Sequence, residues 1–116
     1  MKIKLFLSTF ILLSSYLFAQ ANNGGTETAE IPIIQSAITP NGDGINDFFI
    51  IKNIEQFPSN ELYIFDKSGN LVYHTEYYYN TWDAKKDGKP IAEEMYYYVF
   101  DDGRGTMQTG YLQVGK

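Results

Sequence analysis

The stretch Ile38-Thr39-Pro40-Asn41-Gly42-Asp43-Gly44-Ile45-Asn46-Asp47 is the most informative part of this chain. Short oxygen-bearing side chains recur along it, Gly42 and Gly44 separate them, and Pro40 restrains the entry. Oxygen ligands that alternate along a glycine-relaxed backbone are typical of loops that wrap a hard cation such as Ca²⁺. The stretch therefore predicts either a cation loop or a pair of tight turns at the start of a domain.

The ligand spacing can be compared with a known calcium loop. With Thr39 at the first position, Asn41, Asp43 and Asp47 fall at side-chain ligand positions, and the Ile45 carbonyl falls at the backbone position between them. An EF-hand is excluded, because the last position lacks the bidentate glutamate. Carboxylates from elsewhere would have to complete the site. The candidates at predicted strand ends and turns are Asp66, Asp83, Asp101 and Asp102.

A simpler interpretation of the same stretch needs no metal. Asn41-Gly42 and Asp43-Gly44 are also typical of ordinary turns, in which Asx side chains accept hydrogen bonds from nearby backbone. The residues alone leave both interpretations in place.

The N-terminus has the three parts of a secretory signal peptide. Lys2 and Lys4 form a positive end, the mainly apolar run Leu5–Phe18 follows, and Ala19 is a small residue at its end. The run is shorter than the ~20 residues that a helix needs to span a membrane. We expect cleavage between Ala19 and Gln20, so that residues 1–19 are a signal peptide.

The composition limits the classes of function. The chain has no cysteine, so an exported form has neither disulfides nor a lipid-modified N-terminal cysteine. Its formal net charge of −5 makes it a poor nucleic-acid binder, since phosphate contacts need clustered Lys and Arg. A small domain without disulfides needs another source of stability. Aromatic residues, 16% of the chain, offer a core.

Residues 20–37 are predicted to be a flexible linker, since Asn22-Asn23-Gly24-Gly25 and Thr26-Glu27-Thr28 are small or polar. Residues 38–116 alternate short β-prone runs with turn signals, which predicts an all-β fold, a small antiparallel β-sandwich that is Ig-like in style. The expected strands are Phe48–Ile54, Glu61–Asp66, Leu71–Glu76, Met95–Asp101 and Thr109–Val114.

Two features refine this fold. Lys67-Ser68-Gly69-Asn70 is predicted to be a hairpin turn in which Gly69 takes a positive φ. Tyr96-Tyr97-Tyr98-Val99-Phe100 is apolar or aromatic on both faces. A strand buried on both faces lies inside a sheet, so this one is expected to be central.

No combination of residues indicates an enzyme, and we expect no catalytic residues. His74 is the single histidine, the serines lack the context of a hydrolase nucleophile, and zinc has no His or Cys cluster to bind. Tyr77-Tyr78-Tyr79 and Trp82 suggest stacking on sugar rings. In a small sandwich without disulfides, however, such aromatic residues more often belong to the core.

Five segments of the chain occur in a known order and spacing. They are Thr39–Asp47, Ile64–Tyr73, Trp82-Asp83 followed by Gly88-Lys89-Pro90, Tyr96–Val99 and Gly110–Leu112. Together they resemble the gliding-motility-associated C-terminal domain, the type B sorting domain of the type IX secretion system. The signature positions are Pro40, Gly42, Gly44, Gly69, Trp82, Asp83, Tyr98 and Gly110. The chain departs from the family pattern at Ser68, Ala84 and Glu94-Met95.

The resemblance implies a folded C-terminal address rather than a catalyst. The chain would cross the inner membrane through its signal peptide and fold in the periplasm. The outer-membrane machinery of type IX secretion would then recognise it and take it to the cell surface or the medium. The resemblance also strengthens the expectation of calcium at Asn41, Asp43, Ile45 and Asp47.

The alternative is a small calcium-stabilised surface adhesion or glycan-binding module. The short segment in front of the domain favours it, because family members usually carry a long passenger there.

Overall fold

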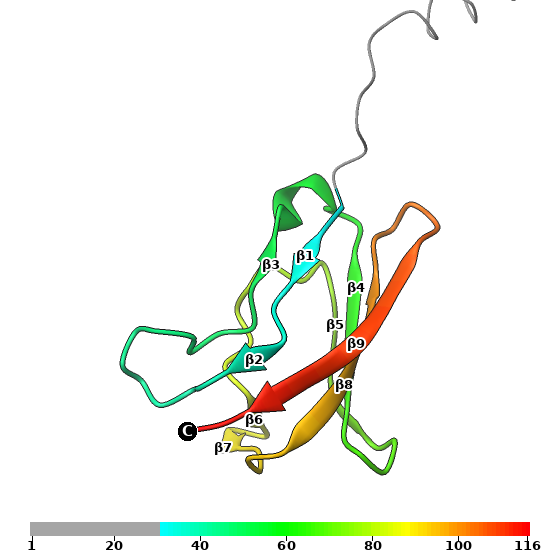
Figure 1. Ribbon diagram of the computed structural model, residues 1–116. Coiled ribbons are helices and arrows are strands. Elements are labelled where there is room, and N and C mark those ends of the chain that lie inside the picture. The colour runs from blue at the N-terminus through cyan, green and yellow to red at the C-terminus, as the bar shows by residue number, and fades with distance from the viewer. Residues whose placement is uncertain (1–30) are drawn as a thin grey trace, which may run out of the picture.

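The computed structural model describes residues 31–116 as an all-β domain in two layers (Figure 1). The predicted signal peptide, residues 1–19, and residues 20–30 of the predicted linker lie outside the described residues. The strands are β1 (Ile33–Ile34), β2 (Ala37–Ile38), β3 (Ile51–Lys52), β4 (Glu61–Phe65), β5 (Leu71–Glu76), β6 (Lys85–Lys86), β7 (Lys89–Pro90), β8 (Met95–Asp101) and β9 (Met107–Val114). A short 3₁₀ helix, η1 (Ile54–Gln56), follows β3.

The first layer is a five-stranded sheet with the order β2-β9-β8-β4-β5. All its pairs are antiparallel except β2 with β9, which is parallel. The prediction that the tyrosine-rich strand is central is confirmed, since β8 has two strands on either side. The physical reason is local. β8 buries Tyr96 and Phe100 on one face and carries the more exposed Tyr97 on the other, and both its edges are paired with neighbouring strands.

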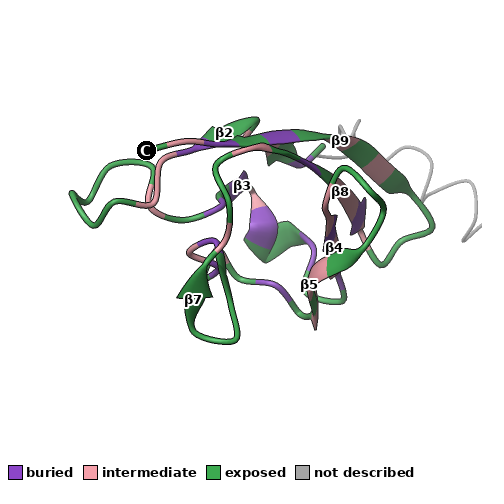
Figure 2. Cartoon of the chain, turned by 90° about the horizontal axis from the view of Figure 1, so that it is seen from below, coloured by how far each residue is buried: buried purple, intermediate pink, exposed green. Residues whose placement is uncertain are grey.

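The second layer is smaller and irregular. β1 pairs with β3 in a two-stranded ribbon, and η1 follows β3. Asn80 and Trp82 connect the segment 77–84 to this layer through hydrogen bonds with Ile51 and Phe49. Figure 2 shows the five-stranded sheet curving over β3 and the short helix, with the buried residues between them. The predicted small β-sandwich is therefore confirmed. One layer is a regular five-stranded sheet, and the other consists mainly of loops with the short β1–β3 ribbon.

The core fills the space between the layers. The sheet contributes Ile38, Leu62, Ile64, Tyr96, Phe100, Leu112 and Val114, and the second layer contributes Phe49, Ile51, Ile54, Phe57, Tyr78, Trp82 and Ala84. All are at most 3% exposed. Each large apolar side chain buried in this way stabilises the fold by about 1.5–3 kcal/mol. The described fold is thus held together without a disulfide.

Two sequence expectations differ from the structure. Most of the strand expected over Phe48–Ile54 does not form. Its end is cut short because Asn53 takes a left-handed conformation (φ 65°) and starts η1, and before β3 the Ile50 N–H donates to the Gln35 side chain instead of a strand partner. The first described strand, β1, precedes the domain start expected at Ile38, because Ile33–Ile34 finds a partner in β3. A strand of two residues is too short to give a recognisable alternation in the sequence.

The turn between β4 and β5 agrees with its prediction. Gly69 has φ 84°, a conformation that only glycine adopts at little cost. The Asp66 carboxylate accepts hydrogen bonds from the backbone N–H groups of Ser68 and Asn70 at 2.9 Å. The turn residues therefore close the hairpin without help from the core.

Candidate functional site

The loop that carries the opening signature joins β2 to β3 and projects from the side of the domain (Figure 1). Its two ends are tied together, since the Thr39 N–H donates to the Asn46 carbonyl at 2.8 Å. Gly42 and Gly44 have φ values of 80° and 84°. A side chain at either position would be strained, which accounts for both signature glycines.

The Asp47 carboxylate organises this loop from within. Its Oδ1 accepts from the N–H groups of Asn41 at 3.0 Å and Gly42 at 2.9 Å, and its Oδ2 accepts from Gly44 at 2.7 Å. The side chains of Asn41 and Asp43 each accept from the N–H group two residues onward, as Asx turns do. The polar signature is therefore a self-bonded loop in this structure.

These contacts bear on the expected calcium ligands. The oxygens of Asn41, Asp43 and Asp47 point at backbone N–H groups, and the Ile45 carbonyl accepts from the Thr39 hydroxyl at 3.5 Å. Each of these oxygens has a further lone pair, so it can accept an N–H group and still be available to a cation. In residues 31–116 there is no group of three or more acidic, His or Cys side chains that could hold a metal. A group of that kind does not include the Asn41 side chain or the Ile45 carbonyl, so calcium binding at these residues stays a prediction.

The four carboxylates proposed to complete the site serve other partners. Asp83 lines a shallow pocket together with Asp47, but its carboxylate pairs with Lys85 Nζ at 3.1 Å. Asp66, Asp101 and Asp102 each accept from backbone N–H groups of their own turns. Each carboxylate therefore has a structural role where it stands.

We expect Asp47→Ala to destabilise the domain by about 1–3 kcal/mol, because three N–H groups lose a charged acceptor. Asp43→Ala removes the acceptor of one N–H group and should cost less. Thermal unfolding with and without a chelator measures both. A loop held by these hydrogen bonds alone would show no effect of the chelator, whereas free calcium at a hundredfold its Kd would add ~2.7 kcal/mol to the free energy of unfolding. A melting temperature that falls when the chelator is added would show instead that the folded domain binds the ion.

The later signature residues lie in or against the core. Trp82 is 3% exposed, stacks on Tyr73 at 5.1 Å between ring centroids, and donates from Nε1 to the Lys85 carbonyl at 3.0 Å. Tyr98 packs against Phe49 and lies across Gly110, where a Cβ would overlap its ring. These positions preserve packing and do not meet at a site.

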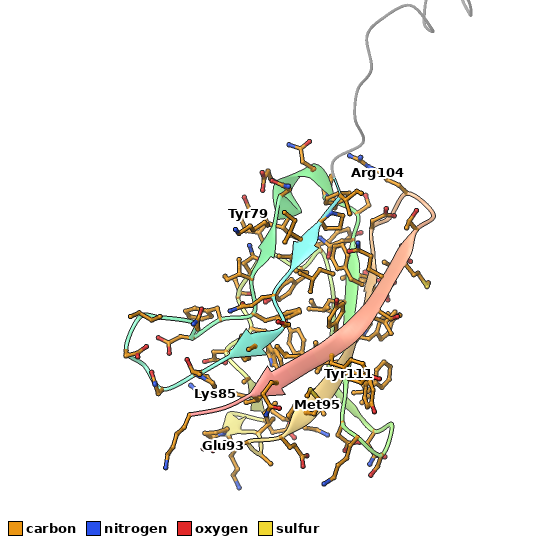
Figure 3. The ribbon with its side chains drawn as sticks, viewed as in Figure 1. Tyr79, Lys85, Glu93, Met95, Arg104 and Tyr111 are labelled. Atoms are coloured by element: carbon orange, nitrogen blue, oxygen red, sulfur yellow. The ribbon has the colours of Figure 1, made fainter. Side chains whose placement is uncertain are left out.

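Burial also decides which aromatic residues are available to a ligand. Tyr78 is 1% exposed, whereas Tyr77 and Tyr79 are 68% and 66% exposed. Figure 3 shows Tyr79 at the surface of the second layer. Of the four residues suggested for sugar stacking, Trp82 and Tyr78 therefore belong to the core, as the sandwich interpretation expects.

Two asparagines with structural roles were missed from the sequence. Buried Asn60 donates to the carbonyls of Phe57 and Tyr78 and accepts from the Tyr78 N–H. Asn80 makes the same kind of pair with both backbone groups of Ile51. Their amides replace strand pairing between distant segments. Asn80 directly follows the tyrosine run, but Asn60 lies before β4, so no local pattern indicated that it binds Tyr78.

His74 lies on the outward side of β5, where its Nε2 is 2.7 Å from Glu61 Oε1. The Tyr63 hydroxyl donates to the same oxygen, and together with His74 it holds the pKa of the Glu61 carboxyl below its ordinary value. The group is a hydrogen-bonded cluster of Glu61, Tyr63 and His74 on the outer side of the sheet. In the described part of the chain, no helix is long and apolar enough to cross a membrane.

One comparison with known proteins gives a match that covers nearly all of the described fold. Residues 32–114 match the family model described as the CHU_C Type IX secretion signal domain. The comparisons with curated proteins and with solved structures found no match. The matched segment begins one residue before β1 and ends with the last residue of β9.

Proposed function

Since the chain belongs to the CHU_C type IX secretion signal domain family, we propose that its folded two-layer domain, taken as a whole, is the address that the secretion machinery recognises. The chain carries a C-terminal sorting signal for type IX secretion, and that signal implies export to the cell surface or the medium. The proposal adds that the signal is a folded surface and not a linear tail.

One observation carries this proposal. The family match and the folded unit have nearly the same limits, since the match covers residues 32–114 and the strands run from Ile33 to Val114. A short linear signal would leave most of the fold outside the shared pattern. The strands also pair over long distances in the chain, β2 with β9 above all. The recognised object therefore exists only once the chain has folded.

The predicted signal peptide completes the route in this proposal. It would bring the chain across the inner membrane, after which the domain folds in the periplasm. The role asks for no covalent chemistry, and the proposed partner is the outer-membrane part of the type IX machinery.

The test uses the full chain with a reporter inserted between Gly24 and Gly25, so that the signal peptide stays in front and residues 31–116 stay behind. We expect the reporter in the medium or on the surface of cells with a working type IX system. In cells that lack the translocon it should stay in the periplasm. A folded domain that stays in the periplasm of the competent cells would overturn the proposal and favour the adhesion module instead.

A further inference from the structure

The side of the five-stranded sheet that faces away from the core carries a second set of aromatic residues. Phe65, Tyr97 and Tyr111 lie in one row across β4, β8 and β9. Tyr63 and Val99 lie in the next row. We call these five residues the outer aromatic face. Tyr111 is 60% exposed and Tyr97 is 40% exposed. Figure 3 shows Tyr111 and Met95 close together on the front of this sheet.

The formal charges on the four strands that form and flank this face have one sign. Glu76, Glu61 and Asp101 lie in register across β5, β4 and β8, at one end of the aromatic rows. Lys and Arg are absent from β4, β5, β8 and β9, which all lie in the described residues. The two-stranded β6–β7 hairpin, by contrast, carries Lys85, Lys86 and Lys89. The outer aromatic face is therefore apolar at its centre and acidic at one end.

The packing of the rings favours a protein partner over a sugar. Tyr63 and His74 have ring centroids only 4.3 Å apart at 20°, so His74 covers one face of the Tyr63 ring. Tyr97 and Tyr111 pack on each other at 5.0 Å and 50°. Sugar stacking needs flat ring faces that are free, and several of these faces are taken. Clustered tyrosines beside apolar side chains are instead typical of hot spots in protein interfaces.

We propose that the outer aromatic face is the surface through which the sorting domain docks on the type IX machinery, on a protein surface that presents Arg or Lys beside an apolar centre. This rests on the proposed function and names its contact surface. Cationic side chains of the partner meet the carboxylate row Glu76, Glu61 and Asp101, and guanidinium groups stack on exposed tyrosines. The apolar centre supplies the buried area, and the rim charges steer the approach.

Export of the full chain, with an epitope tag between Gly24 and Gly25, tests the proposal. The double variant Tyr97→Ser/Tyr111→Ser should lower the exported fraction about tenfold or more, as hot-spot residues do. The matched control is Tyr77→Ser/Tyr79→Ser, which changes two still more exposed tyrosines that are not part of the outer aromatic face and should export normally. Near-UV circular dichroism of the purified chains checks that both variants stay folded.

A second variant covers the case in which the double variant unfolds. Glu76 is exposed, and in the described residues only its backbone carbonyl accepts a hydrogen bond from a side chain, so Glu76→Lys should leave the fold intact. It should still lower export several-fold by repelling a basic partner. Normal export of folded Glu76→Lys and of the folded double variant would overturn the docking surface. Loss of type IX export by the unchanged chain would instead overturn the proposed function.

Crosslinking identifies the protein that binds the outer aromatic face. A photo-crosslinking amino acid at position 111 should give an adduct with an outer-membrane component of the type IX machinery, and one at position 79 should not. An adduct between two copies of the chain would assign the face to self-association and overturn the proposal. An adduct with an unrelated protein, or adducts from position 79 alone, would overturn it as well.

Discussion

Removal of Gly110–Lys116 is expected to abolish both the fold and the export of this chain. The deletion takes away most of β9, including Leu112 and Val114, which are 0% and 1% exposed. It also leaves β2 without its partner and uncovers one edge of the central strand β8. The two buried side chains alone stabilise the fold by about 3–6 kcal/mol. That is comparable with the whole stability of a small domain, about 5–15 kcal/mol.

Limited proteolysis and circular dichroism of the purified chain measure the loss of the fold. The exported fraction of the tagged chain measures the loss of export. Deletion of Lys116 alone is the matched control, because this exposed residue lies beyond β9. If the chain shortened at Gly110 is exported at the normal level, the sorting signal must be a linear segment before Gly110. The proposal of a folded address would then be wrong.

Trp82→Ala is expected to destabilise the domain by about 3–5 kcal/mol. The indole is nearly fully buried between the layers, stacks on Tyr73, and donates to the Lys85 carbonyl. Truncation therefore leaves a cavity and an unpaired carbonyl group. For a domain of this size the melting temperature should fall by roughly 12–40 °C, since each 1 kcal/mol lowers it by about 4–8 °C. Export should fall with it, because fewer molecules present a folded surface.

Thermal unfolding of Trp82→Ala is best compared with Tyr79→Ala, which truncates an aromatic side chain that is 66% exposed. The control should melt within about 0.5 kcal/mol of the unchanged chain, as surface substitutions usually do. Trp82→Phe should fall between them, since it keeps an apolar ring and loses the indole N–H. A Trp82→Ala variant that melts like the control would contradict the packing between the layers.

The strands of the main sheet could be predicted because their signal is local. β4 alternates Leu62 and Ile64 with outward residues, and such a period of two identifies a strand without knowledge of its neighbours. The run Phe48–Ile54 has a similar composition, yet most of it is not a strand. Asn80, 29 residues further along the chain, binds the backbone of Ile51 through its side chain. No local pattern reports a partner at that distance.

The opening loop shows the same division at a smaller scale. Its glycines and Asx residues predicted tight turns, and the turns formed where they were expected. The same residues also fitted the ligand spacing of a calcium loop. The two interpretations differ in where the Asp47 carboxylate points, and that depends on the fold of the entire loop. Its oxygens face three backbone N–H groups, which ligand spacing alone cannot indicate.

The sequence by itself determined the β class, the hairpin turn at Gly69, the central place of β8 and the resemblance to a secretion signal. All of these rest on short-range patterns of residues. Only the tertiary structure decided that Tyr78 is buried while its neighbours Tyr77 and Tyr79 are exposed. It alone aligned Phe65, Tyr97 and Tyr111 in one row. Burial and cross-strand register depend on which distant segments pack together, and three consecutive tyrosines look alike until the chain has folded around one of them.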